Sequence, residues 1–181
     1  MPYYTSSLDL HVEEKNLEAV IVAKIHEYKA QKSEEEIVRE ALENPIGTPK
    51  LRELAKGKNK VVLVTSDHTR AMPSKITLPI LLDEIRKGNP NADITILIAT
   101  GLHRPTTVEE QRRMFGDQIV DNEKIAINNA FKPDDFTYVC TLPSGAGFNV
   151  NKLAVECDLL ITEGFIEPHF FAGFSGGRKS I

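Results

Sequence analysis

The end of the chain combines residue types that can bind and transform a small polar molecule. Its last eighteen residues, Gly164–Ile181, contain Glu167, His169, Lys179 and four glycines, directly after an apolar run. Glycines let the backbone approach a bound group closely or adopt positive φ. An imidazole and an amine supply groups for proton transfer, anion binding or nucleophilic attack. This combination predicts a binding or catalytic loop.

Two further polar clusters follow apolar, β-branched runs. Ser66–Arg70 follows Val61–Thr65, and Thr100–Arg104 follows Ile94–Ala99. In the first cluster, the guanidinium of Arg70 can hold a carboxylate or phosphate through paired hydrogen bonds. In the second, His103 can accept or donate a proton near neutral pH, because a free imidazole titrates near ~6.5.

Each of these residues also has a purely structural interpretation. Asp67 and Thr69 form an Asp-x-Thr pattern that is typical of a turn or helix cap, which is compatible with ligand contact. The side chain of His68 can point away from the site, and an isolated Arg70 can form a surface ion pair. A single loop histidine such as His103 is usually structural, but His169 adds a second imidazole that could act on the opposite face of the same carbon.

The elements between these clusters predict an α/β fold with a mainly parallel, Rossmann-like sheet that helices cover on both faces. Buried strands are expected at Val61–Thr65, Ile94–Ala99 and Asp158–Thr162, with an edge strand at Phe136–Cys140. Helices are expected from Ser33 to Asn44, over Leu51–Ala55, from Ser74 through Ile85, and from Thr107 to near Gly116. Ligands bind beyond the carboxyl ends of such strands.

The third strand is followed by Glu163, Glu167 and His169. All three polar clusters are therefore expected to converge on one crevice at the carboxyl edge of the sheet. Two common nucleotide motifs are excluded there. The phosphate-loop pattern fails because Arg178 stands where it requires glycine, and no G-x-G-x-x-G motif occurs. Lys179 can still bind phosphate as a point charge or form a covalent anchor.

Composition narrows the class of protein. The 181 residues, 41% of them hydrophobic and 27% charged, suit one globular domain, and the net charge of −4 argues against a nucleic-acid surface. Cys140 and Cys157 are expected to be two buried free thiols, which favours a reducing compartment. No leader-like start or membrane-length apolar segment is present, so we expect a cytoplasmic protein with small-molecule partners.

Taken together, the three motifs resemble the N-terminal domain of the nickel-pincer lactate racemase family. They are Ser66-Asp-His-Thr-Arg70, Thr100-Gly-Leu-His-Arg104 and Glu167-Pro-His-Phe-Phe-Ala-Gly-Phe-Ser-Gly-Gly-Arg-Lys-Ser180, in that order along the chain. The resemblance runs from about Leu8 to the last residue. It implies racemisation of a 2-hydroxy acid with a nickel pincer nucleotide that is bound between two domains.

The resemblance also implies a role for each residue. His103 and His169 match the family's acid/base pair, and Arg70 lies near the substrate carboxylate. Asp67, His68, Thr69 and Arg70 match its contact with the cofactor nucleotide, and Lys179 matches the lysine that links covalently to the pincer ring. The metal stays on the pincer, and the family's nickel-binding histidine lies beyond the lysine, outside this chain.

Residues 1–181 are accordingly expected to form an incomplete N-terminal domain of a two-domain racemase, inactive without the second domain. The motifs do not select the substrate, because lactate, malate and larger sugar acids all place a carboxylate next to a carbinol. A racemase or epimerase for another 2-hydroxy acid is therefore one alternative. A non-catalytic module that binds anions or nucleotides through Arg70, Arg178 and Lys179 is the other.

Overall fold

The computed structural model describes residues 2–3, 6–7, 11–20, 22, 24, 27–170 and 172–181. The chain divides into two units, Met1–Ser33 and Glu34–Ile181. In the first unit, β1 (Pro2–Tyr3) pairs antiparallel with β2 (Ser6–Ser7), and the 3₁₀ helix η1 (Glu14–Asn16) follows. All the predicted site residues belong to the second unit.

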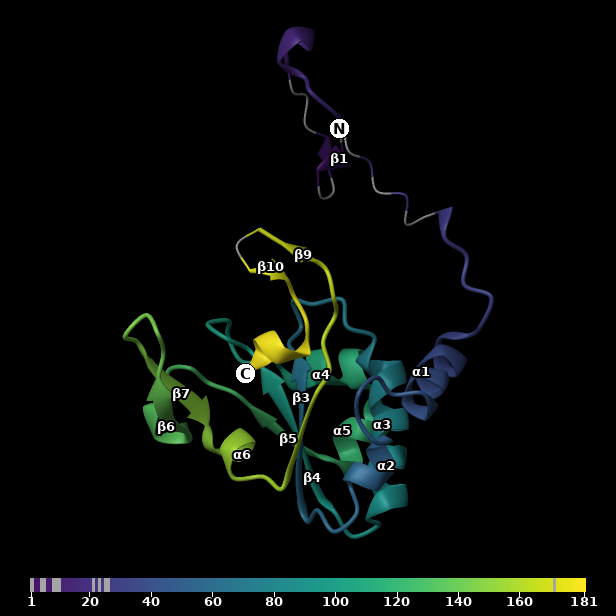
Figure 1. Ribbon diagram of the computed structural model, residues 1–181, viewed down its shortest axis with the longest axis vertical. Helices are drawn as coiled ribbons and strands as arrows, with labels where there is room; N and C mark the ends of the chain where they lie inside the picture. The colour runs from purple at the N-terminus through teal and green to yellow at the C-terminus, as the bar shows by residue number, and fades with distance from the viewer. Residues whose placement is uncertain are drawn as a thin grey trace. The chain divides into compact units, whose positions relative to one another are not determined.

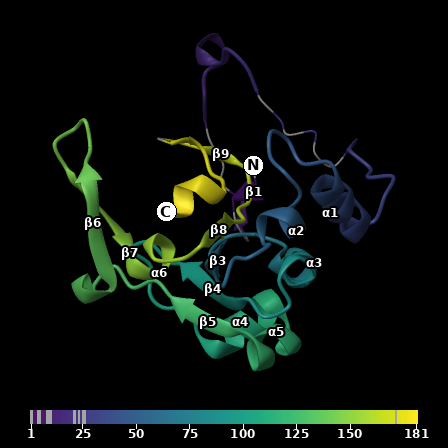
Figure 2. The same cartoon turned by 60° about the horizontal axis from the view of Figure 1, so that its bottom comes forward.

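The second unit is built on a four-stranded parallel sheet with the order β5-β4-β3-β8 (Figures 1 and 2). Its strands are β3 (Lys60–Ser66), β4 (Asp93–Ala99), β5 (Lys124–Ile127) and β8 (Leu159–Thr162). Every neighbouring pair is parallel, so all four carboxyl ends lie at the same edge. The predicted parallel sheet is confirmed, and β5 is a strand that the sequence reasoning missed.

Helices flank this sheet (Figures 1 and 2). On one side lie α1 (Glu34–Glu43), α2 (Leu51–Leu54), α3 (Ser74–Gly88), α4 (Val108–Phe115) and α5 (Asp117–Asn122). On the other lie the short α6 (Lys152–Val155) and an antiparallel ribbon. The predicted helices are confirmed, and α4 begins with a capping box in which the side chains of Thr107 and Glu110 bind each other's backbone N–H groups.

The alternation of side chains along the central strand explains why its sequence is continuously apolar. Val61 and Leu63 are fully buried on the face that packs against the helices, where Phe115 is among their partners. Val62 and Val64 are buried on the opposite face. Both faces of β3 are therefore covered, as a central strand of a parallel sheet requires.

Two sequence expectations about strands need correction. Phe136–Cys140 does not join the main sheet: β6 (Phe136–Thr141) follows the 3₁₀ helix η3 (Pro133–Asp135) and pairs with β7 (Gly147–Asn151) in a separate ribbon. Because a two-stranded ribbon leaves much of its surface in water, Cys140 is exposed rather than buried. β8 is an edge strand and only partly buried, with Leu160 38% exposed, and Cys157 just before it is also only partly buried.

The C-terminal segment forms a hairpin and a final turn beyond the sheet. β9 (Pro168–His169) pairs antiparallel with β10 (Gly173–Phe174), and the 3₁₀ helix η4 (Gly177–Ser180) follows. Among the described residues, none of the helices combines the length and apolar character needed to cross a lipid bilayer.

Candidate functional site

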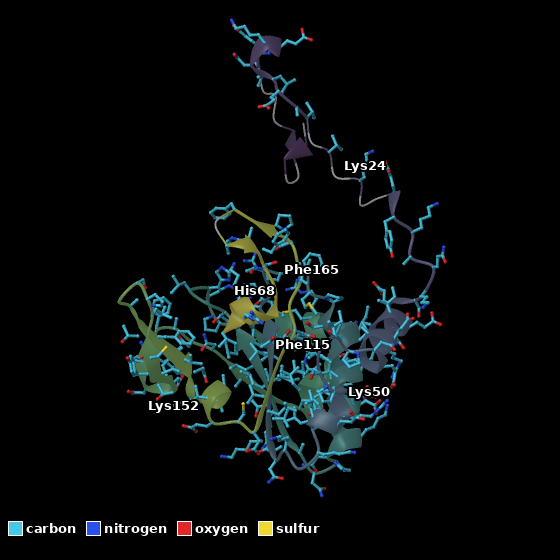
Figure 3. All side chains as sticks on the ribbon, in the orientation of Figure 1. Lys24, Lys50, His68, Phe115, Lys152 and Phe165 are labelled. Carbon is cyan, nitrogen blue, oxygen red and sulfur yellow. The ribbon has the colours of Figure 1, made fainter. Side chains whose placement is uncertain are left out.

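A cavity of about 330 Å³ lies at the carboxyl edge of the sheet. Residues at or just after the ends of all four strands line it: Ser66, Thr100, Asn128 and Gly164. Figure 3 labels His68 and Phe165 toward this end of the sheet. Four of the predicted site residues line the cavity, namely Asp67, Arg70, His103 and Lys179.

Asp67 and His103 form a hydrogen-bonded pair at the cavity wall. Asp67 is 2% exposed, and its Oδ2 lies 2.6 Å from Nδ1 of His103. Its Oδ1 accepts hydrogen bonds from the Oγ1 and backbone N of Thr69, at 2.6 and 3.1 Å. The predicted Asp-x-Thr turn therefore exists, and the same carboxylate also binds the imidazole.

The electrostatics of this pair favour an ionised aspartate. Burial raises the pKa of Asp67, but hydrogen bonds from Thr69 and His103 outweigh burial and hold that pKa below its ordinary value. An ionised Oδ2 accepts only, so it favours the tautomer in which Nδ1 of His103 carries a proton. The Nε2 atom is then left with a free lone pair for proton transfer.

A tight turn places His103 at this position. The backbone N–H of His103 donates to the carbonyl of Thr100 at 2.9 Å, which closes a turn directly after β4. Gly101 occupies this turn with φ of 55°, a left-handed conformation that glycine adopts without steric cost. The turn therefore returns the chain within three residues and presents the imidazole to Asp67.

The opposite wall of the cavity comes from the glycine loop. A Cβ on Gly164 would lie 2.4 Å from the backbone N of Gly177, so the exit of β8 and the start of η4 are in direct backbone contact. This close approach brings Lys179, in η4, to the cavity. Arg70 lines the cavity and also lies 3.9 Å from Glu167, at the distance limit of an ion pair.

Several predicted residues lie elsewhere. Among the described residues, His68, Thr69, Glu163 and His169 do not line this cavity. His68 turns toward the start of α4, with its Nδ1 3.2 Å from Oγ1 of Thr106. That side chain therefore points away from the cavity, an orientation that the sequence analysis left open.

His169 lies on the hairpin rather than in the cavity wall. Its ring stacks on Phe170 with centroids 5.0 Å apart, and its Nδ1 accepts a hydrogen bond from the backbone N of Ala172 at 3.3 Å. Phe170 and Phe174 are 94% and 65% exposed. The base of the hairpin is fixed by Ser175, whose Oγ donates to the carbonyl of Phe165 at 2.7 Å.

The sequence reasoning missed Asn128, which lines the cavity after β5. Its backbone carbonyl accepts a hydrogen bond from Oγ1 of Thr100, and its Oδ1 accepts one from Nδ2 of Asn151 at 3.0 Å. The sequence offered one weak signal, the alternation of Ile125 and Ile127 just before Asn128, which is too short to predict a strand by itself.

Comparison with known proteins gives consistent findings for the whole chain. A family model described as "Lactate racemase N-terminal domain" matches residues 3–181. Proteins named lactate racemase from Thermoanaerobacterium thermosaccharolyticum and Lactiplantibacillus plantarum are 53% and 46% identical over 181 residues. The chain spans 42% and 43% of the length of these two relatives.

Solved structures agree with the fold. The lactate racemase apoprotein from Thermoanaerobacterium thermosaccharolyticum superposes with a TM-score of 0.87 at 52% identity, over 99% of this chain and 42% of that one. A protein from Thermotoga maritima gives a TM-score of 0.60 at 25% identity, over 81% of this chain and 37% of that one.

Proposed function

Because this chain belongs to the lactate racemase N-terminal domain family, we propose that it forms the cofactor-holding and proton-transfer part of a racemase for lactate or a close 2-hydroxy acid. One observation carries the proposal: an imidazole fixed by a buried carboxylate faces the same cavity as a guanidinium and an ε-amine. The second domain, which relatives of more than twice this length have room for, would complete the site. We also propose a cytoplasmic location, which the free thiols of Cys140 and Cys157 support.

The cavity residues fit the nickel pincer nucleotide that the family resemblance implies. Arg70 and Ser180 line the cavity with a guanidinium and a hydroxyl group, which are suitable donors for a phosphate. The backbone contact between Gly164 and Gly177 holds the segment that carries Lys179 against the exit of β8. Lys179 would be the covalent anchor. When bound, the nucleotide would supply a ring that accepts a hydride from the substrate carbon and returns it.

The chain's own residues then have distinct tasks. Arg70 binds the substrate carboxylate through its planar guanidinium and fixes the orientation of the adjacent carbinol. His103 uses Nε2 to take the hydroxyl proton as the hydride leaves, because Nδ1 already carries a proton and donates it to Asp67. Asp67 keeps the imidazole in this tautomer throughout the reaction.

His169 is proposed to serve the opposite face of the planar keto acid, so that each enantiomer meets one imidazole. Its Nδ1 accepts a hydrogen bond from Ala172, so the proton of a neutral ring is on Nε2. Reduction at the second face needs the imidazolium form of this ring, so Nδ1 must release the Ala172 contact and gain a proton first. The ring then gives its Nε2 proton to the keto oxygen as the hydride returns and is left neutral, which balances the proton that His103 takes. The proposal requires the β9–β10 hairpin to bring this ring to the cavity when cofactor and substrate are bound.

The test uses the full-length protein produced together with the enzymes that build the cofactor. Intact-mass and peptide mass spectrometry should find an adduct on Lys179 that is absent from Lys179→Ala. His103→Ala should retain the adduct and lose racemisation of at least one lactate enantiomer, measured by chiral chromatography. Wild-type protein without an adduct and without racemisation would contradict the proposal.

The same preparation separates the alternatives. Wild-type protein that racemises malate or a sugar acid but not lactate would identify a racemase or epimerase for another substrate. Calorimetry that detects specific nucleotide binding in a protein with no racemase activity would favour the non-catalytic module.

A further inference from the structure

A buried carboxylate without a cationic partner lies at the exit of β8. Glu163 is 7% exposed, and its Oε1 accepts hydrogen bonds from Thr65 and Ser74, each at 2.6 Å. Its Oε2 accepts one from Thr77, also at 2.6 Å. Within the part of the chain that the structure describes, no Lys, Arg or His forms a salt bridge with it.

Stability alone does not explain a carboxylate at this position. Burying a charge carries a large desolvation cost, and an apolar side chain of similar volume would stabilise the fold at least as well. The three hydroxyl donors offset that cost. Two of them, on Ser74 and Thr77, belong to the first turn of α3, which contains no acidic residue of its own. Glu163 thus supplies negative charge at the positive end of this helix from another element.

The carboxylate also continues the sheet where the backbone ladder stops. The last paired residues of β3 and β8 are Val64 and Thr162, and the N–H of Glu163 donates to the carbonyl of Val64 at 2.9 Å. One residue further, the side chain of Glu163 binds the side chain of Thr65. The connection between the two strand ends therefore extends by one residue into the site.

Both walls of the cavity begin directly beside this cluster. Thr65 precedes Ser66 and Asp67, which both line the cavity, and Asp67 holds His103. On the other side, Gly164 follows Glu163, lines the cavity, and contacts the backbone that leads to Lys179. A shift of Glu163 would therefore displace the two walls relative to each other.

We infer that Glu163 is a positioning residue, whose carboxylate locks the ends of β3, β8 and α3 so that His103 and Lys179 face one cavity. It touches neither the cavity nor the reacting atoms. The consequence for catalysis rests on the proposed racemase function, whereas the structural part of the inference does not.

Two substitutions in the full-length protein separate geometry from charge. Glu163→Ala removes all three acceptor contacts. In Glu163→Gln the amide oxygen can still accept the hydrogen bonds from Thr65 and Ser74. The hydroxyl of Thr77 can instead donate to the carbonyl of Pro73, 3.4 Å away. We therefore expect Glu163→Gln to keep most of the order and activity of the site that Glu163→Ala loses.

Glu84→Ala is the matched control. Glu84 is also a buried carboxylate, 4% exposed, near the C-terminal end of the same helix, where it pairs with Arg52 and Lys87. It should reduce thermal stability, as Glu163→Ala does, but at a place remote from the cavity.

Amide hydrogen exchange of the apoprotein gives the first measurement. In Glu163→Ala, peptides over residues 65–70 and 163–181 should exchange about 10 to 100 times faster, as expected when hydrogen bonds to a charged group are lost. Glu163→Gln should remain near wild type, and Glu84→Ala should leave these peptides unchanged. Equal exchange of these peptides in Glu163→Ala and Glu84→Ala would overturn the inference.

The cofactor-loaded protein gives the second measurement. Glu163→Ala should lower kcat about 10- to 100-fold with little change in KM, because misplaced catalytic groups affect the transition state. Glu163→Gln should recover most of kcat, and Glu84→Ala should retain it. If wild type is inactive, the proposed function fails while the exchange result still decides the role of Glu163. If Glu163→Ala does not fold, Thr77→Val, which removes one donor, replaces it in both measurements.

Discussion

The substitution Asp67→Asn should reverse the tautomer of His103 while it keeps a hydrogen-bonding side chain beside the imidazole. Asparagine can place its carbonyl at the Oδ1 position and keep both hydrogen bonds from Thr69. Its NH₂ group then takes the Oδ2 position, 2.6 Å from Nδ1 of His103. Two donors cannot share that contact, so Nδ1 must become the acceptor and the proton must move to Nε2.

The size of the effect follows from this one contact. A hydrogen bond to a charged group contributes about 1.5–3 kcal/mol, and the lower end applies because His103 is 49% exposed. The free energy of unfolding should therefore fall by only about 1.5 kcal/mol. Racemisation should fall by about 10²- to 10⁴-fold, the usual contribution of a positioned general base, because Nε2 can no longer accept a proton.

The direct assay is a long-range ¹H–¹⁵N NMR spectrum of the histidine rings at a pH where they are neutral, recorded on apoprotein. Wild type should show His103 protonated on Nδ1, and Asp67→Asn should show it protonated on Nε2. Asp117→Asn, an exposed carboxylate in α5 that pairs with Arg112, is the control and should leave His103 unchanged. An unchanged tautomer in Asp67→Asn would refute the assigned role of Asp67.

Three other predictions address the supports of the site. Gly101→Ala should cost about 1–2 kcal/mol by urea denaturation, because φ of 55° disfavours a Cβ although no atom lies within 4 Å of it; an unchanged stability would mean that the turn relaxes freely. Gly164→Ala should cost about 3 kcal/mol, because its Cβ would overlap the backbone N of Gly177, and a loss below ~1 kcal/mol would contradict that close packing. Hydrogen bonds, first from Arg104 and then from the backbone of Thr107, lower the pKa of Glu110 from 4.5 to about 2. The stability that Glu110 contributes should therefore be complete above pH 4.5 and be lost as the pH falls through about 2. Arg104→Gln should return the pKa of Glu110 toward 4.5 in an NMR titration, and no movement would show that Arg104 is not the cause.

Local sequence signals predicted the elements that are long and strongly patterned. Val61–Thr65 and Ile94–Ala99 are mostly apolar on both faces, which predicts buried strands of a parallel sheet, and β3 and β4 confirm them. β5 was missed because four residues carry too little periodicity. The ribbon of β6 and β7 was misplaced because strand propensity does not say which sheet a strand joins.

The sequence by itself determined which chemical groups reach the carboxyl edge directly: Asp67, Arg70 and His103 follow strands of a parallel sheet, whose carboxyl ends share one edge. Lys179 reaches the same cavity only through the backbone contact between Gly164 and Gly177. Only the tertiary structure decided where the remaining side chains point. It turned His68 toward Thr106 and left His169 on the hairpin. It also buried Glu163 beneath the cavity among three hydroxyls. The physical reason is that a strand's end fixes the position of a residue, whereas the direction of its side chain depends on partners that are distant in sequence.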